Sequence, residues 1–366
     1  MSTARVVEAA LADGLTIVAD DLTGALDSAG AFAASGPVVV DLDGSRTTSA
    51  RLCLDTDSRD GGLAQATTRT EAAFSRRRSG LWFKKVDSLL RGWPFDETCA
   101  AFRAGGFQRI LFAPAFPDTG RVTTDGRQFI RTATGLRPVG PVFVEAFRSL
   151  GLRAAALADG DVEASCEVIV ADIETNADFQ RTVDALGRGV DDTLFVGSGG
   201  LAAALGGATR FIEEPVPEIA ICGTNHPVTL TQIAIAADAG FEIVALDGTE
   251  PRWTAGPAVL VPPAQAEGSA HAARQIAQSL RRLAARPRPP RSAIVTGGAT
   301  LRLLLDATSA GGLDCLGLQA PGIAVCRIRG GTWEGVTIVS KSGGFGPDSF
   351  LLSQFQGHGD DRSRNP

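Results

Sequence analysis

Short hydrophobic runs rich in β-branched residues alternate with longer stretches rich in Ala, Leu and Arg along the whole chain. Each run ends in polar or glycine-rich residues, as strands do when they enter a turn. In the first half, the runs predict strands over Leu15–Ala19, Pro37–Val40, Arg51–Asp55, Leu81–Lys85, Arg109–Ala113, Glu167–Ala171 and Thr193–Val196. In the second half, they predict strands over Glu218–Cys222, Phe241–Leu246, Ala258–Val261, Ala293–Thr296, Ile323–Ile328 and Val336–Ser340. Because strands that alternate with helices form parallel sheets, the pattern predicts an α/β protein in which helices flank mainly parallel sheets.

The composition between Arg210 and Pro217 separates the two series of strands. The sequence RFIEEPVP has the proline and charge content of a linker. A chain of 366 residues is also long enough for two domains. We therefore predict one domain over residues 1–212 and a second over residues 217–356, with residues 357–366 as a disordered tail.

The overall composition is that of a soluble globular protein and argues against several classes of function. Hydrophobic residues make up 44% of the chain and charged residues 21%. The net charge of −6 and the lack of a basic run argue against nucleic-acid binding. No run of about 18 apolar residues is present, and the N-terminus lacks the apolar core of a signal peptide. We therefore expect a cytoplasmic protein with no membrane partner.

The cysteines and histidines offer little metal chemistry. None of the six cysteines forms a C-x-x-C pair, so we expect reduced, buried thiols. The three histidines, His226, His271 and His358, lie far apart in the sequence. We therefore predict no metal-binding set of side chains.

Two aspartates, Asp20 and Asp21, follow the first predicted strand directly in LTIVADDLTGALDSAG. Adjacent carboxylates repel one another unless a cation, a metal or a substrate hydroxyl meets them. Either aspartate could instead be the N-cap of the helix that follows. Both together at the end of a strand indicate a ligand site, because ligands bind at that edge of a parallel sheet.

Further polar residues follow the strand in LWFKKVDSLLRGWP, namely Lys85, Asp87, Ser88 and Arg91. Such a set suits a hydroxy acid, because arginine binds a carboxylate while aspartate and serine bind hydroxyls. A solvent-facing cluster of ion pairs is the alternative. In APAFPDTGRVTTDGRQF we expect a rigid loop that shapes a pocket, with Arg121 as its anion-binding candidate.

Lysine is rare in this chain, and its three occurrences lie in motifs suited to anions. The 35 basic residues include only Lys84 and Lys85, in FKKVDSLLRG, and Lys341, in VSKSGGFG; the rest are arginine. A lysine is a compact point charge that reaches one or two anionic oxygens. We predict an anion-binding role for all three.

Two glycine-rich turns in the second half suit phosphate groups. One is Lys341, Ser342, Gly343 and Gly344, which supplies an ammonium, a hydroxyl and backbone N–H groups. The other is Gly297 and Gly298, followed by Thr300 where a helix begins. No G-x-x-x-x-G-K-[ST] motif occurs, so the chain is not a P-loop enzyme.

A third glycine-rich stretch, Gly197-x-Gly199-x-x-Ala202, formally matches a dinucleotide-binding fingerprint. The acidic partner residue would have to end the next strand, where the chain has the linker-like RFIEEPVPE. Close packing of a helix on the sheet explains these glycines equally well.

Seven motifs occur in order along the chain: ADDLTGALDSAGAFAASG, LDTDSR, KKVDSLLRG, APAFPDTGRVTTDG, GSGGLA, TGGAT and KSGGFG. In this order and at these spacings they resemble the four-carbon acid sugar kinase family, which includes threonate, erythronate and 3-oxo-tetronate kinases. The resemblance extends from about Thr16 to about Leu352. It implies an N-terminal domain that binds the sugar acid and a C-terminal domain that binds ATP with Mg²⁺. It also implies phosphoryl transfer to the terminal hydroxyl of the acid in a cleft between the domains.

The resemblance carries over residue by residue. On the substrate side it implies roles for Asp20, Asp21, Thr23, Lys85, Asp87, Ser88 and Arg91, and more loosely for Arg59 and Arg121. On the nucleotide side it implies roles for Gly297, Gly298, Thr300, Lys341, Gly343 and Gly344. The chain departs from the family at Ala299, where an acidic residue is common, and at Thr224, Asn225 and His226, where a serine-rich turn is expected.

Phosphoryl transfer needs a group that accepts the proton of the substrate hydroxyl. We expect this base to be Asp21, ahead of Asp20, with Asp87 in reserve. Two other functions stay open: a sugar-acid sensor without catalysis, and a nicotinamide-dependent oxidoreductase, although the chain contains no tyrosine to serve it. The identity and stereochemistry of the four-carbon acid are also open, and the one protein partner we predict is a second copy of the chain, in a homodimer.

Overall fold

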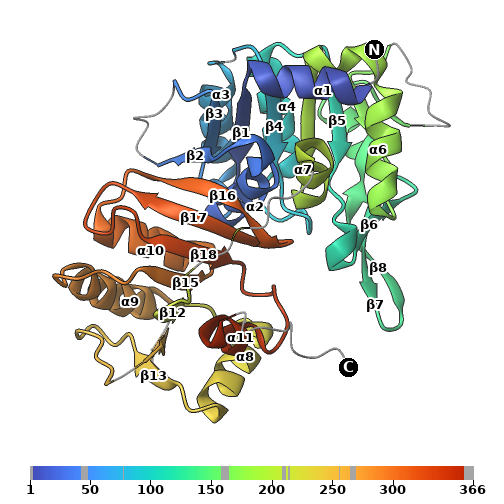
Figure 1. Ribbon diagram of the computed structural model, residues 1–366. Helices are drawn as coiled ribbons and strands as arrows, with labels where there is room; N and C mark the ends of the chain where they lie inside the picture. Colours follow the sequence, from blue (N-terminus) through green and yellow to red (C-terminus); the bar gives the residue numbers. More distant parts are fainter. Residues whose placement is uncertain are drawn as a thin grey trace, which may run out of the picture. The chain divides into compact units, whose positions relative to one another are not determined.

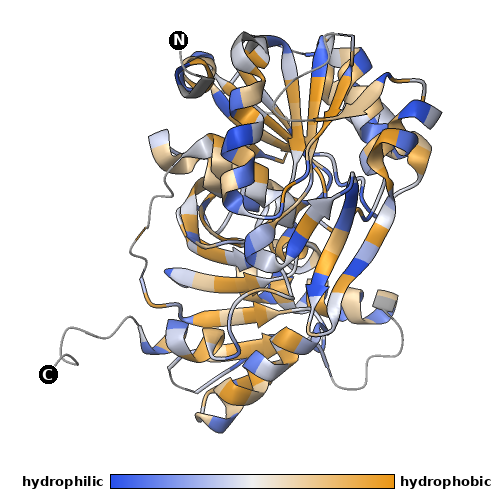
Figure 2. Ribbon diagram, turned by 90° about the vertical axis from the view of Figure 1, so that its right-hand side faces the viewer, coloured by the Kyte–Doolittle hydropathy of each residue, from blue (hydrophilic) through white to orange (hydrophobic). Residues whose placement is uncertain are grey.

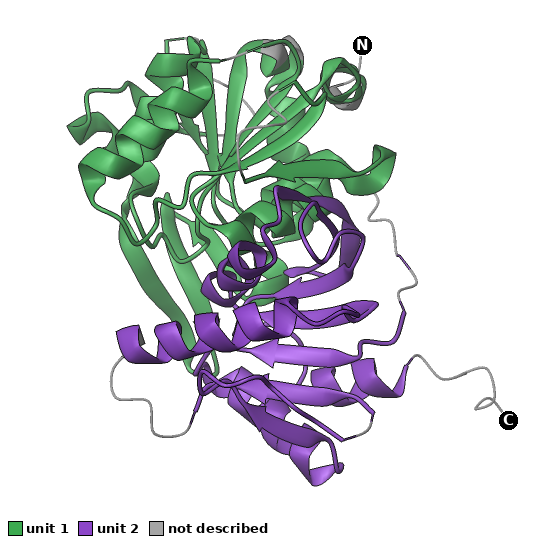
Figure 3. Ribbon diagram, turned by 90° about the vertical axis from the view of Figure 1, so that its left-hand side faces the viewer, with its two compact units in different colours: residues 1–210 green, residues 211–366 purple. Residues whose placement is uncertain are grey.

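The computed structural model describes residues 3–42, 48–76, 78–157, 165–207, 212, 215–254, 256–263 and 269–357. The chain divides into two compact units, residues 1–210 and 211–366 (Figure 3). Half of the predicted linker, residues 210, 211, 213 and 214, lies outside the described residues, as do residues 358–366 of the predicted tail. In the described part of the chain, no helix is long and apolar enough to cross a membrane.

Unit 1 alternates strands and helices in the way the hydrophobic pattern predicts (Figure 1). Its strands are β1 (Leu15–Ala19), β2 (Val38–Asp41), β3 (Arg51–Asp55), β4 (Leu81–Lys85), β5 (Arg109–Ala113), β6 (Arg121–Thr124), β7 (Arg127–Thr132), β8 (Gly135–Val142), β9 (Ala154–Ala156), β10 (Val168–Val170) and β11 (Thr193–Gly197). Its α-helices are α1 (Thr3–Asp13), α2 (Leu22–Ala31), α3 (Leu63–Phe74), α4 (Pro94–Gly105), α5 (Phe143–Ser149), α6 (Asn176–Ala185) and α7 (Gly199–Gly206). Short 3₁₀ turns are η1 (Ala33–Ser35), η2 (Pro117–Thr119) and η3 (Gly187–Asp192).

The main sheet of unit 1 is parallel, in the order β2-β3-β1-β4-β11-β5-β10-β9. Helices α3, α4 and α5 contact one another on one face, and α1, α2, α6 and α7 do so on the other. Strands covered on both faces are hydrophobic throughout, as Figure 2 shows for the central strands. The core includes Phe112, whose ring centroid lies 5.1 Å from that of Phe143 and 4.9 Å from that of Phe147.

A separate antiparallel sheet, β6-β7-β8, replaces the rigid loop that the sequence led us to expect around Arg121. Strands β6 and β7 pair from Thr124 with Arg127, so the connection between them is Asp125–Gly126. Both connecting residues have positive φ angles, 50° and 66°. Asp-Gly is a strong signal for a two-residue hairpin turn, and here it overrides the loop-forming tendency of the prolines nearby. The prediction of a loop was therefore wrong.

Unit 2 repeats the α/β pattern with an antiparallel extension. Its strands are β12 (Ile219–Cys222), β13 (Glu242–Ala245), β14 (Ala258–Val261), β15 (Ser292–Thr296), β16 (Gly312–Ala320), β17 (Ile323–Arg329) and β18 (Thr337–Lys341). Its helices are α8 (Pro227–Asp238), α9 (Ser269–Ala284), α10 (Gly298–Thr308) and α11 (Phe350–Gln356). The order is β13-β14-β12-β15-β18 in parallel, followed by antiparallel β17 and β16.

The predicted strands agree closely with the structure where each is a buried run. The bounds of β1, β3, β4, β5 and β14 are those predicted, and the fold class, α/β with mainly parallel sheets and flanking helices, is confirmed. The short strand β9 and the strand β16, which carries glycine and polar residues, were missed. All six cysteines are buried thiols, as predicted.

Candidate active site

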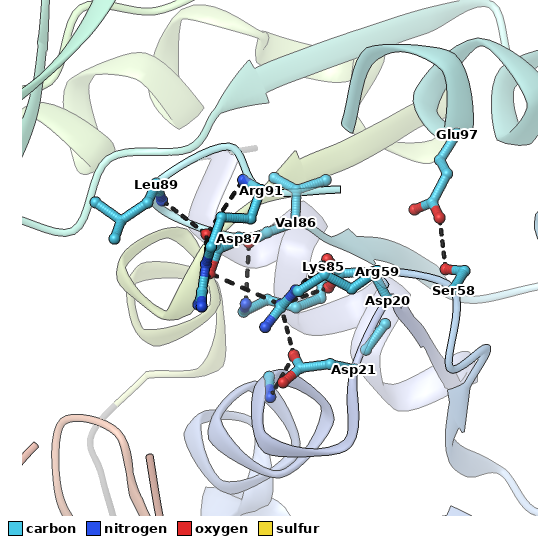
Figure 4. Close-up of polar contacts among 12 residues, drawn as sticks. Asp20, Asp21, Ser58, Arg59, Lys85, Val86, Asp87, Leu89, Arg91 and Glu97 are labelled. Atoms are coloured by element: carbon cyan, nitrogen blue, oxygen red, sulfur yellow. Dashed lines mark hydrogen bonds and ion pairs between the residues drawn. The ribbon is translucent and has the colours of Figure 1, made fainter. Parts of the chain in front are cut away.

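In unit 1, charged side chains gather where three neighbouring strands end. Strands β3, β1 and β4 are adjacent and parallel, so the loops that follow them meet at one edge of the sheet. Asp20 and Asp21 follow β1, Arg59 follows β3, and Lys85 ends β4, just before Asp87. Figure 4 shows these side chains turned toward one another. These residues, which the family resemblance assigns to the substrate side, therefore lie together at one edge of the sheet.

Arg59 lies at the centre of this cluster. Its Nε and Nη2 donate to the two carboxylate oxygens of Asp20 at 2.8 and 2.9 Å. Its Nη2 also lies 2.5 Å from Oδ1 of Asp21 and 3.8 Å from Oδ1 of Asp87. The backbone N–H of Arg59 donates to the carbonyl of Asp20, which fixes the loop to the end of β1. The guanidinium thus relieves the repulsion between the adjacent aspartates. Sequence reasoning gave Arg59 only a loose role, and its central position is the main addition from the structure.

Asp87 forms a second bidentate pair, with Arg91. Both of its carboxylate oxygens accept from the Arg91 side chain at 2.8 Å, and Oδ2 also accepts from the backbone N–H of Leu89 at 3.2 Å. Burial alone would raise the pKa of Asp87, but the hydrogen bonds and charges of Arg91 and Arg59 hold that pKa well below its usual range. Asp87 is therefore a permanent anion that orients Arg91, whose side chain is 60% exposed.

Asp21 differs from the other two aspartates in exposure and in proton affinity. Its side chain is 22% exposed, against 5% for Asp20 and 8% for Asp87. Burial, reinforced by the charge of Asp20, raises the pKa of Asp21 in spite of Arg59 and Lys85. The pKa of Asp20 is lowered instead, because Arg59, Lys84 and Lys85 outweigh its burial. Of the three carboxylates, Asp21 is the most accessible and the readiest to take a proton.

Asp21 is also the N-cap of α2. Its Oδ1 accepts from the backbone N–H of Gly24 at 3.0 Å, so the capping alternative is confirmed. Among the described residues, Oδ2 of Asp21 accepts no hydrogen bond. Capping through one oxygen leaves the other for a substrate, so the two roles do not exclude each other.

Lys85 differs from the arginines because no carboxylate of the described residues lies within ion-pair distance of its Nζ. The ammonium donates to the carbonyl of Val86 at 2.9 Å and lies over the first turn of α2. Gly24 makes this approach possible, because a Cβ there would lie 2.8 Å from Nζ. A buried ammonium without an ion pair, beside three carboxylates, is suited to receiving the carboxylate of a ligand.

The remaining predicted substrate residues lie around this cluster with weaker contacts. Thr23 is half-buried in the first turn of α2, and Ser88 is half-buried after Asp87. The Ser88 carbonyl accepts from Nε2 of Gln128 at 2.9 Å, and Gln128 is fully buried in β7. Burial lowers the pKa of Arg121, and the charge of Asp87 opposes this shift. Gln128 was missed by sequence reasoning because its strand was read as a loop.

A buried network beneath the cluster was also missed. Nζ of Lys84 lies 2.7 Å from Oε2 of Glu97, and both side chains are almost completely buried. Oε1 of Glu97 accepts from the hydroxyl of Ser58 at 2.5 Å. Ser58 directly precedes Arg59, so the hydrogen bond from Ser58 to Glu97 links the Arg59 loop to α4 (Figure 4). The prediction that Lys84 binds a ligand anion is wrong, because the ammonium is committed to Glu97.

In unit 2, three turns meet at the corresponding edge of the sheet. They follow β12, β15 and β18, which are neighbours in the order β12-β15-β18. The N–H of Gly297 donates to the carbonyl of Lys341 at 2.9 Å, which links two of the turns. Gly297 has a φ of 97°, a conformation that other residues rarely adopt, directly before α10. The predicted nucleotide residues Gly297, Gly298 and Thr300 are thus close to the turn that holds Lys341, Ser342, Gly343 and Gly344.

The departures from the family pattern have local explanations. Nδ1 of His226 accepts from the N–H of Val228 at 3.3 Å and so caps α8, and Oγ1 of Thr224 accepts from the N–H of His226. His226 and Thr224 thus accept backbone hydrogen bonds of the kind that a serine commonly accepts at a helix N-terminus. Ala299 is exposed in the first turn of α10 and offers no side-chain ligand.

The glycines of the dinucleotide-like stretch are explained by packing. A Cβ on Gly199 would lie 2.1 Å from Oδ2 of Asp27, and a Cβ on Gly200 would lie 2.8 Å from the carbonyl of Ala115. These residues begin α7, which packs directly on α2. The structure thus favours the packing explanation over dinucleotide binding.

The side chains of the candidate site could hold Mg²⁺ only together with the phosphate groups of a nucleotide. Among the described residues, no group of three or more His, Cys, Asp or Glu could hold a metal ion. Asp20 and Asp87 are each occupied by an arginine fork. Mg²⁺ commonly binds proteins through one or two carboxylates and takes its other ligands from phosphates and water. Such an ion would therefore arrive with the nucleotide.

Comparisons with known proteins also distinguish an N-terminal and a C-terminal part of the chain. A family model for a sugar-binding N-terminal domain matches residues 15–146, and one for a nucleotide-binding C-terminal domain matches residues 253–351. The chain is 30% identical to the D-threonate kinase of Bordetella bronchiseptica, in an alignment that covers 93% of this chain and 96% of that protein. It is 28% identical to the D-threonate kinase of Cupriavidus necator, with 93% and 97% covered.

Solved structures share the fold. A Salmonella typhimurium LT2 protein, described provisionally as a tRNA synthase, superposes with a TM-score of 0.74 at 19% identity, covering 93% of this chain and 98% of that one. Haemophilus influenzae protein HI1011 gives a TM-score of 0.68 at 17% identity, with 93% and 99% covered. At these identities the likeness concerns the fold alone.

An α/β protein with a cation-bridged aspartate cluster in one unit and glycine-rich turns in the other fits a phosphotransferase. The chain belongs to the four-carbon acid sugar kinase family, as its similarity to D-threonate kinases over nearly its whole length shows. The predictions of this family and of an enzyme are confirmed.

Proposed function

We propose that the protein uses MgATP to phosphorylate the terminal hydroxyl of a four-carbon sugar acid, with D-threonate as the first candidate. The relatives at 28–30% identity are named D-threonate kinases, which supports this choice of acid. Erythronate and 3-oxo-tetronates share the same chain length and carboxylate, so they are the closest competitors for the pocket.

The observation that carries the proposal is the state of Asp21. A kinase of this type needs a base that accepts the proton of the attacking hydroxyl. Asp21 has a carboxylate oxygen without a hydrogen bond, and burial raises the pKa of its carboxyl group. Asp20 and Asp87 are held as anions by bidentate arginines and accept a proton less readily. Asp21 therefore acts as the base.

The carboxylate of the acid would bind to Lys85 and Arg91. Lys85 lacks an ion pair within the described part of the chain, and Arg91 is exposed while Asp87 fixes its orientation. A fixed carboxylate at one end and a base at the other would select the terminal hydroxyl of a short chain. Thr23, Ser88 and Arg121 would bind the hydroxyls between them.

The nucleotide would bind to the turns of unit 2. Among the described residues, the backbone N–H groups of Gly298, Ala299 and Thr300 begin α10 without acceptors, as expected at a helix N-terminus. The N–H groups of Gly343 and Gly344 also lack acceptors there. Phosphate oxygens would accept from both sets, and Mg²⁺ would neutralise the charge that develops during transfer. A soluble homodimer in the cytoplasm stays a prediction.

An ADP-release assay with a panel of acids tests the proposal. We expect turnover with D-threonate, and slower or no turnover with D-erythronate, L-threonate and 3-oxo-tetronates. Release of ADP that does not depend on any acid would contradict a kinase. A folded protein that binds D-threonate but releases no ADP would favour the sensor instead.

A further inference from the structure

Most carbonyl groups of the glycine-rich turn after β18 accept hydrogen bonds from buried side-chain donors. Lys341 Nζ lies 3.4 Å from the carbonyl oxygen of Ser342 and 3.2 Å from that of Phe345. Oγ1 of Thr229 donates to the carbonyl of Gly343 at 2.7 Å. Nε2 of Gln232 donates to the carbonyls of Phe345 and Pro347 at 3.2 and 2.9 Å. Three donors thus hold one turn from a single side.

These donors come from two elements and lie in the core of unit 2. Thr229 and Gln232 lie on successive turns of α8, and Lys341 ends β18. All three side chains are fully buried. Lys341 Nζ also lies 3.3 Å from Oγ1 of Thr229, so the donors are linked to one another. We call Thr229, Gln232 and Lys341 the carbonyl clamp.

The clamp determines which backbone groups remain for a ligand. Within the described residues, the N–H groups of Gly343, Gly344 and Gly346 have no acceptor, whereas the carbonyls of Gly343 and Gly346 accept hydrogen bonds from the clamp. A turn whose carbonyls are held on one side presents its N–H groups on the other, which is the arrangement of an anion nest. Gly343 is needed for this, because a Cβ there would lie 2.9 Å from Cβ of His226.

The position of Lys341 differs from that of a lysine that touches phosphate. The ammonium is fully buried, and in the described part of the chain no carboxylate forms an ion pair with it. Its contacts are the hydroxyl oxygen of Thr229 and two carbonyl oxygens of the turn, together with the ring of Phe350, whose centroid lies 5.7 Å away. It therefore acts on a ligand through the turn.

The oxygen of the Gln232 side chain supports the same interpretation. Oε1 of Gln232 is buried and accepts from no described donor, while Nε2 serves several carbonyls. Leaving a buried amide oxygen unpaired costs stability. A leucine would avoid that cost but would leave these carbonyls without their donor.

We propose that Thr229, Gln232 and Lys341 are positioning residues for the nucleotide. They hold the carbonyls of the turn inward so that its free N–H groups bind the phosphates; the carbonyls held are those of Ser342, Gly343, Phe345, Gly346 and Pro347. The inference rests on the proposed function, because it assumes that unit 2 binds ATP. It replaces a direct contact between Lys341 and phosphate with an indirect one. It adds Thr229 and Gln232, which sequence motifs did not mark.

Calorimetric titration with MgADP and steady-state kinetics test the clamp together. We expect Thr229→Val to weaken MgADP binding and raise the KM for ATP about 5–30-fold, with the KM for the sugar acid unchanged, because one buried carbonyl loses its donor. Thr229→Ser keeps the hydroxyl and should restore both values to within about twofold. Thr308→Val is the matched control, because Oγ1 of the equally buried Thr308 also donates to carbonyls but lies in α10 away from the turn. It should leave both constants unchanged.

The double variant Thr229→Val/Lys341→Met separates positioning from direct contact. If both residues act through the turn, their combined effect is smaller than the product of the single effects. A multiplicative effect, with Lys341→Met alone costing more than about 100-fold, would make Lys341 a phosphate ligand and overturn its indirect role. Should Thr229→Val fail to fold, Gln232→Met takes its place with the same expectations.

The failures of the two proposals are distinguishable. A wild-type protein that binds MgADP, with Thr229→Val and Gln232→Met binding equally well, overturns the clamp alone. A folded wild-type protein that binds no MgADP contradicts the nucleotide half of the proposed function, and the clamp falls with it.

Discussion

Each unit places polar groups at the carboxyl edge of its own parallel strands, but the two candidate sites consist of different chemical groups. In unit 1 the site consists of charged side chains in bidentate pairs, such as Asp20 with Arg59 and Asp87 with Arg91. In unit 2 it consists of backbone N–H groups, and the one nearby ammonium, Lys341, is buried among carbonyls. A sugar acid has a single carboxylate and several hydroxyls, which need side chains placed individually. Phosphates present many equivalent oxygens, for which a row of N–H groups suffices.

The largest effect is expected from Asp21→Asn, which tests the chemistry of unit 1. Asparagine caps a helix as well as aspartate but cannot take a proton, so kcat should fall roughly 10²–10⁴-fold while the melting temperature stays near that of the wild type. The matched control is Asp178→Asn, because Asp178 belongs to the capping box of α6 and lies in no candidate site. It should leave kcat unchanged. Near-native kcat in Asp21→Asn would move the base to Asp87.

The buried pair below the unit 1 site should give the largest effect on stability. Lys84→Met leaves Glu97 as a buried carboxylate without its cation, which should cost about 3–5 kcal/mol of the free energy of unfolding. Lys84→Met/Glu97→Gln removes the stranded charge and keeps an acceptor for Ser58, so it should recover at least half of the loss. Urea denaturation measures both. A single variant as stable as the wild type would show that the pair does not hold the Arg59 loop.

Lys341 should behave in the opposite way to Lys84. Replacing its buried ammonium by an uncharged side chain should raise the free energy of unfolding at neutral pH. Burial lowers the pKa of Lys341 from 10.5 to about 8, with a small opposing effect of Cys222. Between pH 8 and 10.5 the unfolded chain binds more protons at this residue, so stability rises with pH across that window. The difference in unfolding free energy between wild type and Lys341→Met should therefore change by at most about 3 kcal/mol in favour of the wild type from pH 7.5 to 10. A difference that is constant with pH would refute the lowered pKa.

The pH dependence of catalysis should reveal the smaller influence of Arg59. The base must be deprotonated, so kcat/KM falls as pH falls through the pKa of Asp21, which lies above the usual aspartate value. Arg59 lowers the pKa of both Asp20 and Asp21, so Arg59→Gln should move this acid limb to higher pH. Arg69→Gln is the control, because Arg69 donates to the carbonyls of Thr56 and Asp57 in the same loop. An acid limb that stays in place in Arg59→Gln would exclude Asp21 as the group that titrates.

The contrast between the units also explains what the sequence could predict. Charged residues at strand ends, such as Asp20, Asp21 and Asp87, were visible because their type and position are unusual. The role of Glu97 was hidden, because a glutamate in the first turn of a helix is ordinary and only the packing of α4 on the preceding strand, β4, brings its side chain to Lys84. Thr229 and Gln232 were hidden for the same reason, since only the fold of the turn after β18 brings its carbonyls to α8.

Local turn chemistry accounts for the errors in the fold. Asp125–Gly126 was a legible hairpin signal that the neighbouring prolines obscured, and with it Gln128 was lost from the site. Buried parallel strands such as β1 and β4 were predicted to the residue, because both faces of each are covered and the hydrophobic run is therefore continuous.

The central claim is that unit 1 binds the acid and unit 2 binds the nucleotide, and one substitution made in both units tests it most directly. Lys85→Met and Lys341→Met each remove a buried ammonium and keep the length of the side chain. Initial rates measured with both substrates varied should show a raised KM for D-threonate in Lys85→Met alone, and a raised KM for ATP in Lys341→Met alone. The account would be contradicted if both variants raised the same KM, or if Lys85→Met affected only ATP.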